Sequence, residues 1–313
     1  MEHLLQLENV SVLYHEGNGS LQLLEDVSFS MQAASITTIV GESGSGKTTL
    51  ARSITRLFLR PEFFTASGSI RFRGQELWKL PEEQLRIIRR DHIRYVFQES
   101  AQSLNPLTRI ETQLRDAAGA KSGSIILTEL LHQVGLDNPE RILRSFPHEL
   151  SIGMLQRVTI AMALAPSPQL IIADEPTSAL DPPLKFQILD LLVSIKQRFG
   201  ISVLVITHDT TVPESYADQI VILNSGRIFE IGPRIDFMKT PFHPYSLMLF
   251  HKETARQSGL NPPRGPLSSP LDGLPRGCKF QNHCPRVQES CCQQEPPLER
   301  VSPERLVRCF YWK

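Results

Sequence analysis

The sequence predicts an α/β fold: a doubly wound, mainly parallel sheet with a helical insertion and an irregular, cysteine-bearing C-terminal tail. Three observations lead to it. Short apolar, strand-like runs alternate with helical patterns before residue 100 and after residue 166, which is typical of a parallel sheet. Residues 100–166 have helical periodicity without clear strands. The chain after residue 255 is dense in proline and glycine, which predicts a linker or a wrapped tail.

The N-terminal half is predicted from its apolar runs and their breakers. Strands are expected within residues 4–40, at LLQLENVSVLY and SITTIV, followed by a helix over 47–58. SGSIRFRGQEL predicts a hairpin, and residues 81–97 predict a charged helix and then the strand IRYVFQ. After the helical insertion, QLIIAD and SVLVITH predict strands, residues 183–198 and 213–218 predict helices, and QIVILNSGRIFEIG predicts a second hairpin.

Composition narrows the class of protein. The 313 residues contain 33 Lys plus Arg and 33 Asp plus Glu, so the formal net charge is zero. This balance argues against a nucleic-acid-binding protein, because neutralising phosphates needs a surplus of cations. The N-terminus has no basic segment followed by an apolar run, so we expect no signal peptide. The apolar runs are also far shorter than the ~20 residues of a membrane helix.

The stretch GESGSGKTT at residues 41–49 fits the phosphate-binding loop G-x-x-x-x-G-K-[ST], and it lies between a predicted strand and a predicted helix. Backbone N–H groups of such a loop surround phosphates, and the helix N-terminus adds the positive end of its dipole. The Lys47 amine is expected to reach the β- and γ-phosphates, and the Thr48 hydroxyl to coordinate Mg²⁺. The nucleotide-binding candidates here are Gly41, Ser43, Gly44, Ser45, Gly46, Lys47, Thr48 and Thr49.

Two strand ends carry the other candidate groups. QLIIADEP places Asp174 and Glu175 at the end of a strand predicted to be buried, where one carboxylate could hold Mg²⁺ and the next could polarise an attacking water. LVITH ends another strand at His208, which could contact the γ-phosphate. The sequence therefore predicts a nucleoside-triphosphate site with Mg²⁺.

With these motifs, the chain resembles the ATP-binding cassette (ABC) transporter ATPases over about residues 1–250. The matching positions are Gln98 in VFQES, the signature segment LSIGM at 150–154, SALD at 178–181 and Tyr14 in SVLYHEG. The resemblance implies an antiparallel β subdomain beside the parallel core and a helical subdomain at about 100–166. It also implies that Glu175, His208 and Gln98 are catalytic, and that Thr48, Gln98 and Asp174 hold Mg²⁺. Tyr14 would stack on adenine.

SLNP, ADEPTSALD, HPYS at 243–246 and the cysteine-bearing tail resemble the peptide/nickel/opine importer branch, with dipeptide and oligopeptide importer ATPases as the nearest likeness. Residues 251–313 would be the C-terminal extension of that branch. The resemblance implies a second ATPase subunit, two membrane permease subunits and an extracytoplasmic substrate-binding protein. The chain would act at the cytoplasmic face of the membrane. Nickel, metal chelates and opines remain open as cargo beside peptides.

In the family, two ATPase subunits close head to tail, so each signature segment covers the partner's ATP. Ser151, Gly153 and Asp181 would act there, with Ser151 as a helix N-cap. Ile152 replaces a glycine of the usual LSGGQ pattern. If it is the first helical residue, its φ is negative and a β-branched side chain is tolerated. The Ile152 side chain would displace the contact that the Gly153 N–H makes with the phosphate, so we expect an asymmetric heterodimer in which the site that this chain covers on its partner is slower. A soluble cassette ATPase and a mainly ATP-binding regulatory subunit are the alternatives.

All five cysteines follow residue 277. Thiolates suit zinc or iron–sulfur clusters, but the spacings lack the C-x2-C pair of zinc ribbons. Reduced cysteines packed in the tail are the third reading. The family resemblance implies a 4Fe-4S cluster on Cys278, Cys284, Cys291 and Cys309, with Cys291 preferred over Cys292 on spacing.

Overall fold

The computed structural model describes residues 3–17, 19–58, 60–99, 102–119, 126–257, 260 and 277–312. These residues form two compact units. The first unit comprises Met1–Met31, Thr37–Trp78 and Thr207–Lys313, and the second comprises Gln32–Ile36 and Lys79–Ile206.

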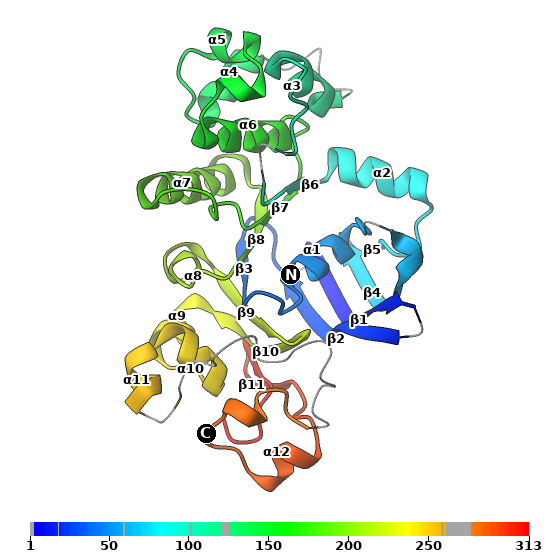
Figure 1. Cartoon of the computed structure of the whole chain (residues 1–313), viewed down its shortest axis with the longest axis vertical. Coiled ribbons are helices and arrows are strands. Elements are labelled where there is room, and N and C mark those ends of the chain that lie inside the picture. Colours follow the sequence, from blue (N-terminus) through cyan, green and yellow to red (C-terminus); the bar gives the residue numbers. More distant parts are fainter. Residues whose placement is uncertain are drawn as a thin grey trace. The chain divides into compact units, whose positions relative to one another are not determined.

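The first unit contains an antiparallel sheet formed by long N-terminal strands (Figure 1). Its order is β2 (Gly19–Met31), β1 (Leu5–Glu16), β4 (Phe64–Phe72) and β5 (Gln75–Glu76). The register of β1 on β2 runs from Leu5 opposite Met31 to Glu16 opposite Gly19. Leu5 and Leu7 are buried on one face of β1, as the alternation of apolar residues predicts. This sheet is the antiparallel subdomain implied by the family resemblance.

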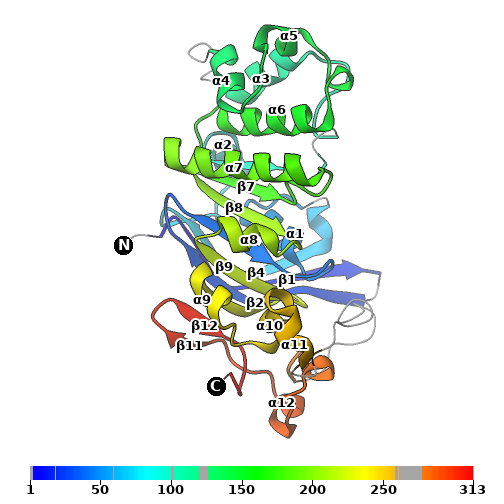
Figure 2. The same cartoon turned by 90° about the vertical axis from the view of Figure 1, so that its left-hand side faces the viewer.

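The same unit holds five further strands in the order β11-β12-β10-β9-β3. Strand β3 pairs with β9 in parallel, and the remaining pairs are antiparallel. The bounds are β3 (Ile36–Val40), β9 (Gln219–Asn224), β10 (Arg227–Pro233), β11 (Glu299–Ser302) and β12 (Arg305–Val307). The helices of this unit are α1 (Lys47–Ile54), α8 (Thr211–Tyr216), α9 (Arg234–Lys239), α10 (Pro244–Phe250), α11 (Lys252–Gln257) and α12 (Glu289–Gln293), with short 3₁₀ turns η1 (Pro61–Phe63) and η4 (Gln281–His283). Helices α9 and α10 pack against β10, and Figure 2 shows these two helices beside α11.

The second unit has three parallel strands in the order β8-β7-β6, namely β8 (Ser202–Thr207), β7 (Leu170–Asp174) and β6 (Ile93–Val96). Every residue of β7 is buried, which explains the apolar run LIIA that precedes Asp174. The helices are α2 (Glu82–Asp91), α3 (Ile110–Ala118), α4 (Leu127–Gln133), α5 (Pro139–Arg144), α6 (Ile152–Leu164) and α7 (Pro182–Phe199), with the 3₁₀ turn η3 (Pro147–Glu149). Helices α3–α6 pack on one another as the predicted helical insertion.

The predicted α/β fold class is confirmed, and most elements lie where the sequence places them. Helix α1 ends at Ile54, before the predicted residue 58. The reason is a Schellman motif: the Leu57 N–H donates to the Arg52 carbonyl and the Arg56 N–H to the Ser53 carbonyl. Arg56 takes a φ of +53°, where glycine is usual, so the sequence gives no stop signal there.

The tail is more regular than expected. Strands β11 and β12 extend the sheet of the first unit, with Ile231 of β10 opposite Leu306 of β12. The proline- and glycine-rich segment before the tail falls largely on residues 261–276, which lie outside the described residues. Among the described residues, none of the helices combines the length and apolar character that crossing a membrane requires.

Candidate functional site

The phosphate loop joins β3 to α1, as the sequence predicts. Gly46 is the N-cap of α1 with a φ of +100°, a conformation that a side chain would strain. Gly41 is required by space, because a Cβ there would lie 2.0 Å from the backbone oxygen of Leu223 in β9. The Gly226 N–H, at the turn between β9 and β10, donates to the Ser45 carbonyl at 3.0 Å. The β9–β10 hairpin therefore packs against the backbone of the phosphate loop and supports it.

Lys47 folds back along this loop. Its side-chain amine donates to the carbonyl oxygens of Gly41 and Glu42, both at 2.8 Å, and the residue is 6% exposed. The Ser45 hydroxyl is buried and has no hydrogen-bond partner among the described residues. A buried hydroxyl of this kind, in a cradle that a Cβ would fill, fits a phosphate oxygen as its partner.

The remaining loop residues are open to solvent to different degrees. Ser43 and Gly44 are exposed, whereas Thr48 and Thr49 are half-buried in the first turn of α1. Burial raises the pKa of the Glu42 carboxyl, and the charge of Lys47 opposes this shift. The first unit thus brings together all the loop residues that the sequence singles out.

The two predicted acids lie at the end of β7 in the second unit. Asp174 is its last residue and is 3% exposed, and its carboxylate accepts a hydrogen bond from the Tyr95 hydroxyl at 2.7 Å. Glu175 has a φ of +49°, an uncommon conformation for a residue with a side chain. It is held there because its N–H donates to the Ile206 carbonyl at 2.8 Å and its carbonyl accepts from the Ser178 N–H at 3.2 Å. Strain of this kind clusters at active sites.

Other predicted residues sit at the ends of elements. Gln98 follows β6 and is exposed, Asp181 is the exposed N-cap of α7, and His208 is exposed directly after β8. Tyr14 is half-buried near the end of β1, with its ring 5.2 Å from that of Phe64. Of the predicted site, the first unit contains the loop, His208 and Tyr14. The second contains Gln98, the acids, the signature residues and Asp181.

The signature segment begins helix α6. Ser151 is its N-cap, and the Ser151 hydroxyl accepts the Met154 N–H at 3.3 Å. The predicted N-cap is confirmed. Ile152 is the first helical residue, as expected, and its side chain is 57% exposed. Gly153 is buried, and a Cβ there would meet Leu184 of α7 at 3.4 Å.

The tail cysteines lie near one another in the first unit. Cys278 and Cys291 are buried, Cys284 and Cys309 are half-buried, and Cys292 is exposed. The Cys278 N–H donates to the Cys291 carbonyl at 2.7 Å. Burial raises the pKa of the Cys278 thiol to about 12 and that of Cys309 to about 11, and neighbouring cysteines raise both further. The expected metal site is not found, however: among the described residues, His, Cys, Asp and Glu side chains nowhere gather in threes that could hold a metal ion.

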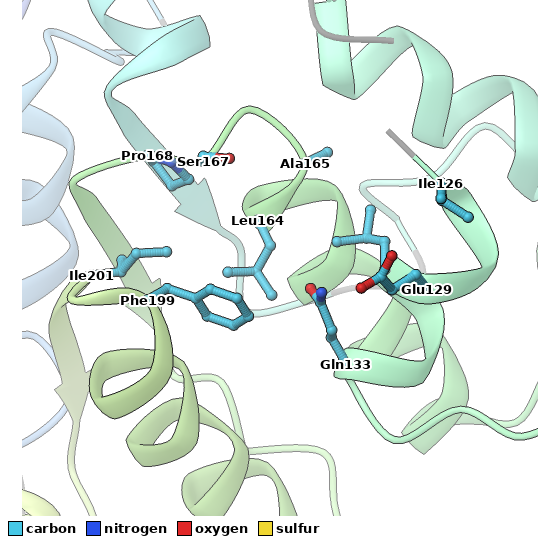
Figure 3. A pocket seen from close by; sticks show the side chains of 10 residues that line it. Ile126, Glu129, Gln133, Leu164, Ala165, Ser167, Pro168, Phe199 and Ile201 are labelled. Carbon is cyan, nitrogen blue, oxygen red and sulfur yellow. The ribbon is translucent and has the colours of Figure 1, made fainter. Parts of the chain in front are cut away.

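A cavity of about 360 Å³ lies in the second unit, on the side of α4 and the C-terminal ends of α6 and α7 (Figure 3). Apolar side chains of Ile126, Leu164 and Phe199 line it together with Glu129 and Gln133. None of the residues predicted to bind nucleotide lines this cavity. The cavity is therefore not the predicted nucleotide site.

Two tyrosines contact the site without having been singled out in the sequence. Tyr95 donates to Asp174, and the Tyr245 hydroxyl accepts the N–H of Glu42 in the phosphate loop at 3.1 Å. Tyr95 precedes Gln98 in the strand YVFQ, and parallel pairing of β6 with β7 sets Tyr95 opposite Ile172. Tyr245 belongs to HPYS, which the sequence analysis used only to narrow the family.

Comparison with known proteins decides the family. The family described as "ABC transporter" matches residues 24–178, and the family described as "Oligopeptide/dipeptide transporter, C-terminal region" matches residues 229–291. The oligopeptide transport ATP-binding protein OppD of Escherichia coli (strain K12) is 36% identical over 98% of this chain and 93% of its own length. This chain belongs to the ABC transporter ATPases. This ABC ATPase is also 33% identical to the oligopeptide transport ATP-binding protein AppD of Bacillus subtilis (strain 168), over 100% of this chain and 98% of AppD.

Solved structures agree with this assignment. The ATP-binding cassette MJ0796, solved as a dimer in a post-hydrolysis state bound to ADP and Pi, is 30% identical to this ABC ATPase. It matches with a TM-score of 0.64 over 74% of this chain and 98% of MJ0796. CbiO1 of Clostridium perfringens, at 22% identity and a TM-score of 0.66, shares the fold over 83% of this chain and 100% of its own.

Proposed function

We propose that this ABC ATPase hydrolyses ATP as a subunit of an importer for peptides, acting at the cytoplasmic face of the membrane through two permease subunits. An extracytoplasmic binding protein would deliver the peptide. One observation carries the proposal: a chain with a complete phosphate loop is similar over nearly its whole length to proteins whose names describe oligopeptide transport. The match of residues 229–291 to the oligopeptide/dipeptide C-terminal region supports peptides over nickel or opines.

Binding of ATP is assigned to the loop. Its phosphates would meet the backbone of residues 41–49, the orphan Ser45 hydroxyl and the Lys47 amine, while Tyr14 would stack on the adenine. The donor set also fits Mg²⁺, which prefers oxygen ligands: the Thr48 hydroxyl, the Asp174 carboxylate and the Gln98 amide oxygen would hold it. Bound there, the ion would neutralise charge on the transferring phosphoryl group.

Hydrolysis is assigned to Glu175, with His208 and Gln98. The Glu175 carboxylate would orient or deprotonate the attacking water, and the constrained left-handed backbone sets the direction in which this side chain leaves the chain. The Tyr95 hydroxyl would hold the Asp174 side chain in place for the metal.

The partner subunit is proposed to be a different ABC ATPase. Ser151 and Gly153 would cover the partner's ATP, and Asp181 would link the two sites. Ile152 presents a largely exposed butyl group at the start of α6, where a glycine would leave the backbone open. The Ile152 side chain would displace the Gly153 N–H from the partner's phosphate. Losing one such preorganised donor to developing charge costs about 10²–10³ in rate. The site covered by this chain is therefore expected to be slow.

Replacing Ile152 separates this idea from a symmetric dimer. Ile152→Gly is expected to raise the ATPase rate of the assembled complex, whereas Ile152→Val, which keeps the branched side chain, leaves it unchanged. Equal ATPase rates for both variants and the native complex would refute the proposed asymmetry.

For the tail, the finer proposal is a 4Fe-4S cluster on Cys278, Cys284, Cys291 and Cys309. Support comes from two buried and two half-buried thiols that perturb one another's pKa. The fit is partial, because the described side chains do not form a metal-binding set, and no step of hydrolysis involves the cluster. Anaerobic purification followed by absorption spectroscopy and iron analysis tests it: absence of iron would refute the proposal.

The ATPase role is tested in the complex co-expressed with its membrane subunits. Glu175→Gln is expected to lower the rate by at least about 10²-fold while ATP binding is retained. An unchanged rate would mean that this chain's site is silent, as in a regulatory subunit. Failure of the chain to purify with membrane subunits would favour a soluble cassette ATPase.

A further inference from the structure

The first peptide of the phosphate loop is fixed from both ends. Its carbonyl, from Gly41, accepts the Lys47 amine at 2.8 Å, and its N–H, from Glu42, donates to the Tyr245 hydroxyl at 3.1 Å. One planar group therefore connects the phosphate-binding lysine with Tyr245, which is 203 residues from Glu42 in the sequence. Rotation of that plane would move the Gly41 carbonyl, one of the two that accept the Lys47 amine.

The Tyr245 hydroxyl is suited to this task because it stays neutral and has a fixed position. Tyr245 is fully buried (0% exposed) in α10, and its hydroxyl is also hydrogen-bonded to the Asn224 side chain at the end of β9. Burial raises the pKa of this hydroxyl far above its usual value, and the nearby Glu42 charge adds to the shift. It therefore remains protonated at every physiological pH.

The ring of Tyr245 is held by β10 and by the tail. The Phe229 ring meets it edge-on at 5.6 Å, and the Phe280 ring, from the cysteine-bearing segment, lies 5.6 Å away. The Tyr245 N–H donates to the buried His243 ring at 3.0 Å. Tyr245, Phe229 and Phe280 belong to the core cluster that also contains Cys278 and Cys291. The tail core thus packs directly against the side chain that contacts the loop.

A second connection runs through the sheet. Strand β12 of the tail pairs with β10, and the turn between β9 and β10 donates the Gly226 N–H to the Ser45 carbonyl. The tail therefore contacts both supports of the loop: it pairs with β10 of the β9–β10 hairpin, and its Phe280 ring packs against Tyr245.

We propose that Tyr245 is a positioning residue for ATP binding. Its hydroxyl orients the Gly41–Glu42 peptide, and hence Lys47, and the tail keeps its ring in place. This inference rests on the proposed function, in which Lys47 binds the nucleotide phosphates. Because Lys47 contacts these phosphates before and during hydrolysis, loss of the hydroxyl weakens binding of ATP and leaves the chemical step nearly unchanged.

Tyr245→Phe removes only the hydroxyl and keeps the ring. The control is Tyr311→Phe, which removes a tail hydroxyl that is hydrogen-bonded to Ser290 at 2.8 Å and not to the loop. The assembled complex is assayed for the KM and kcat of ATP hydrolysis, and binding of a fluorescent ATP analogue with Mg²⁺ and thermal unfolding are measured alongside. We expect KM and Kd to rise about 2- to 12-fold for Tyr245→Phe, the range of one hydrogen bond. We expect kcat to stay within about twofold, and Tyr311→Phe to match the native complex.

The outcomes separate the inference from the function on which it rests. If the native complex does not bind the ATP analogue, the proposed function fails. If it binds and Tyr245→Phe binds equally well, or loses only thermal stability or kcat, the inference is wrong. Should Tyr245→Phe not assemble, Phe280→Leu takes its place, since it retains the hydroxyl but loosens the ring. It should raise KM by a smaller factor, and an unchanged KM would overturn the inference.

Discussion

The buried ion pair between Arg305 and Glu230 joins β12 of the tail to β10. Glu230 is 0% exposed, and its carboxylate accepts the Phe242 N–H at 3.0 Å, the His243 N–H at 2.9 Å and the Arg305 Nε–H at 3.0 Å. The Arg305 guanidinium also lies 3.6 Å from the centroid of the Phe242 ring. Replacing Arg305 should therefore loosen the tail.

The expected loss in the free energy of unfolding follows from the groups that Arg305→Leu leaves buried. Arg305→Leu leaves the Glu230 carboxylate buried, with two backbone donors and without its ion-pair partner, and breaking such a pair costs about 3–5 kcal/mol. Adding Glu230→Gln to Arg305→Leu removes that charge, so the double variant should be more stable than Arg305→Leu alone. Arg71→Leu is the matched control, because Arg71 pairs with Glu8 at the surface, where the two side chains are 41% and 51% exposed. Its cost should be below about 1 kcal/mol.

Tryptophan fluorescence during urea unfolding measures the effect. The Trp312 ring lies 5.2 Å from the Phe242 ring and reports the docking of the tail once the other tryptophan is removed by Trp78→Phe. The reasoning is refuted if Arg305→Leu lowers the free energy of unfolding by no more than Arg71→Leu does.

Three further predictions concern the site and the tail. Gly41→Ala should weaken ATP binding at least about tenfold, because the added Cβ needs space occupied by the β9 backbone; equal affinity in a nucleotide-binding assay would contradict this. Tyr95→Phe should raise the Mg²⁺ concentration for half-maximal ATPase about 10- to 100-fold, since it removes the hydrogen bond from the Tyr95 hydroxyl to the Asp174 carboxylate, and an unchanged Mg²⁺ titration would show that the hydrogen bond is dispensable. In the cluster-free chain, iodoacetamide at pH 8 should modify the exposed Cys292 before Cys278, whose pKa of about 12 keeps it a thiol at pH values well below 12. Mass spectrometry of the native chain gives the order, and equal rates would contradict the burial.

The phosphate loop could be predicted because its requirements are local. Glycine at 41 and 46, a lysine and the flanking strand and helix are all contained in a short stretch of sequence. Ser151 as the N-cap of α6 is local in the same way, because a cap bonds within its own first turn. Such features need no knowledge of the rest of the fold.

The supports of the site could not be predicted, since they join distant segments. Tyr245 and Glu42 are 203 residues apart, and Arg305 and Glu230 are 75 apart. HPYS therefore served as a family marker and gave no sign of a contact with the loop. The regular strands of the tail were missed because β11 and β12 are short and are stabilised by pairing with β10, whereas their own sequence has weak strand character.

Peptide uptake into proteoliposomes that contain the assembled importer tests the central claim most directly, with ATP supplied on the side of this chain. The account predicts ATP-dependent accumulation of labelled oligopeptide by the native complex, and its loss with Glu175→Gln although the nucleotide still binds. Undiminished uptake with Glu175→Gln would show that hydrolysis on this chain does not drive transport. ATP-dependent uptake of a nickel chelate or an opine, with no uptake of peptide, would contradict the proposed substrate.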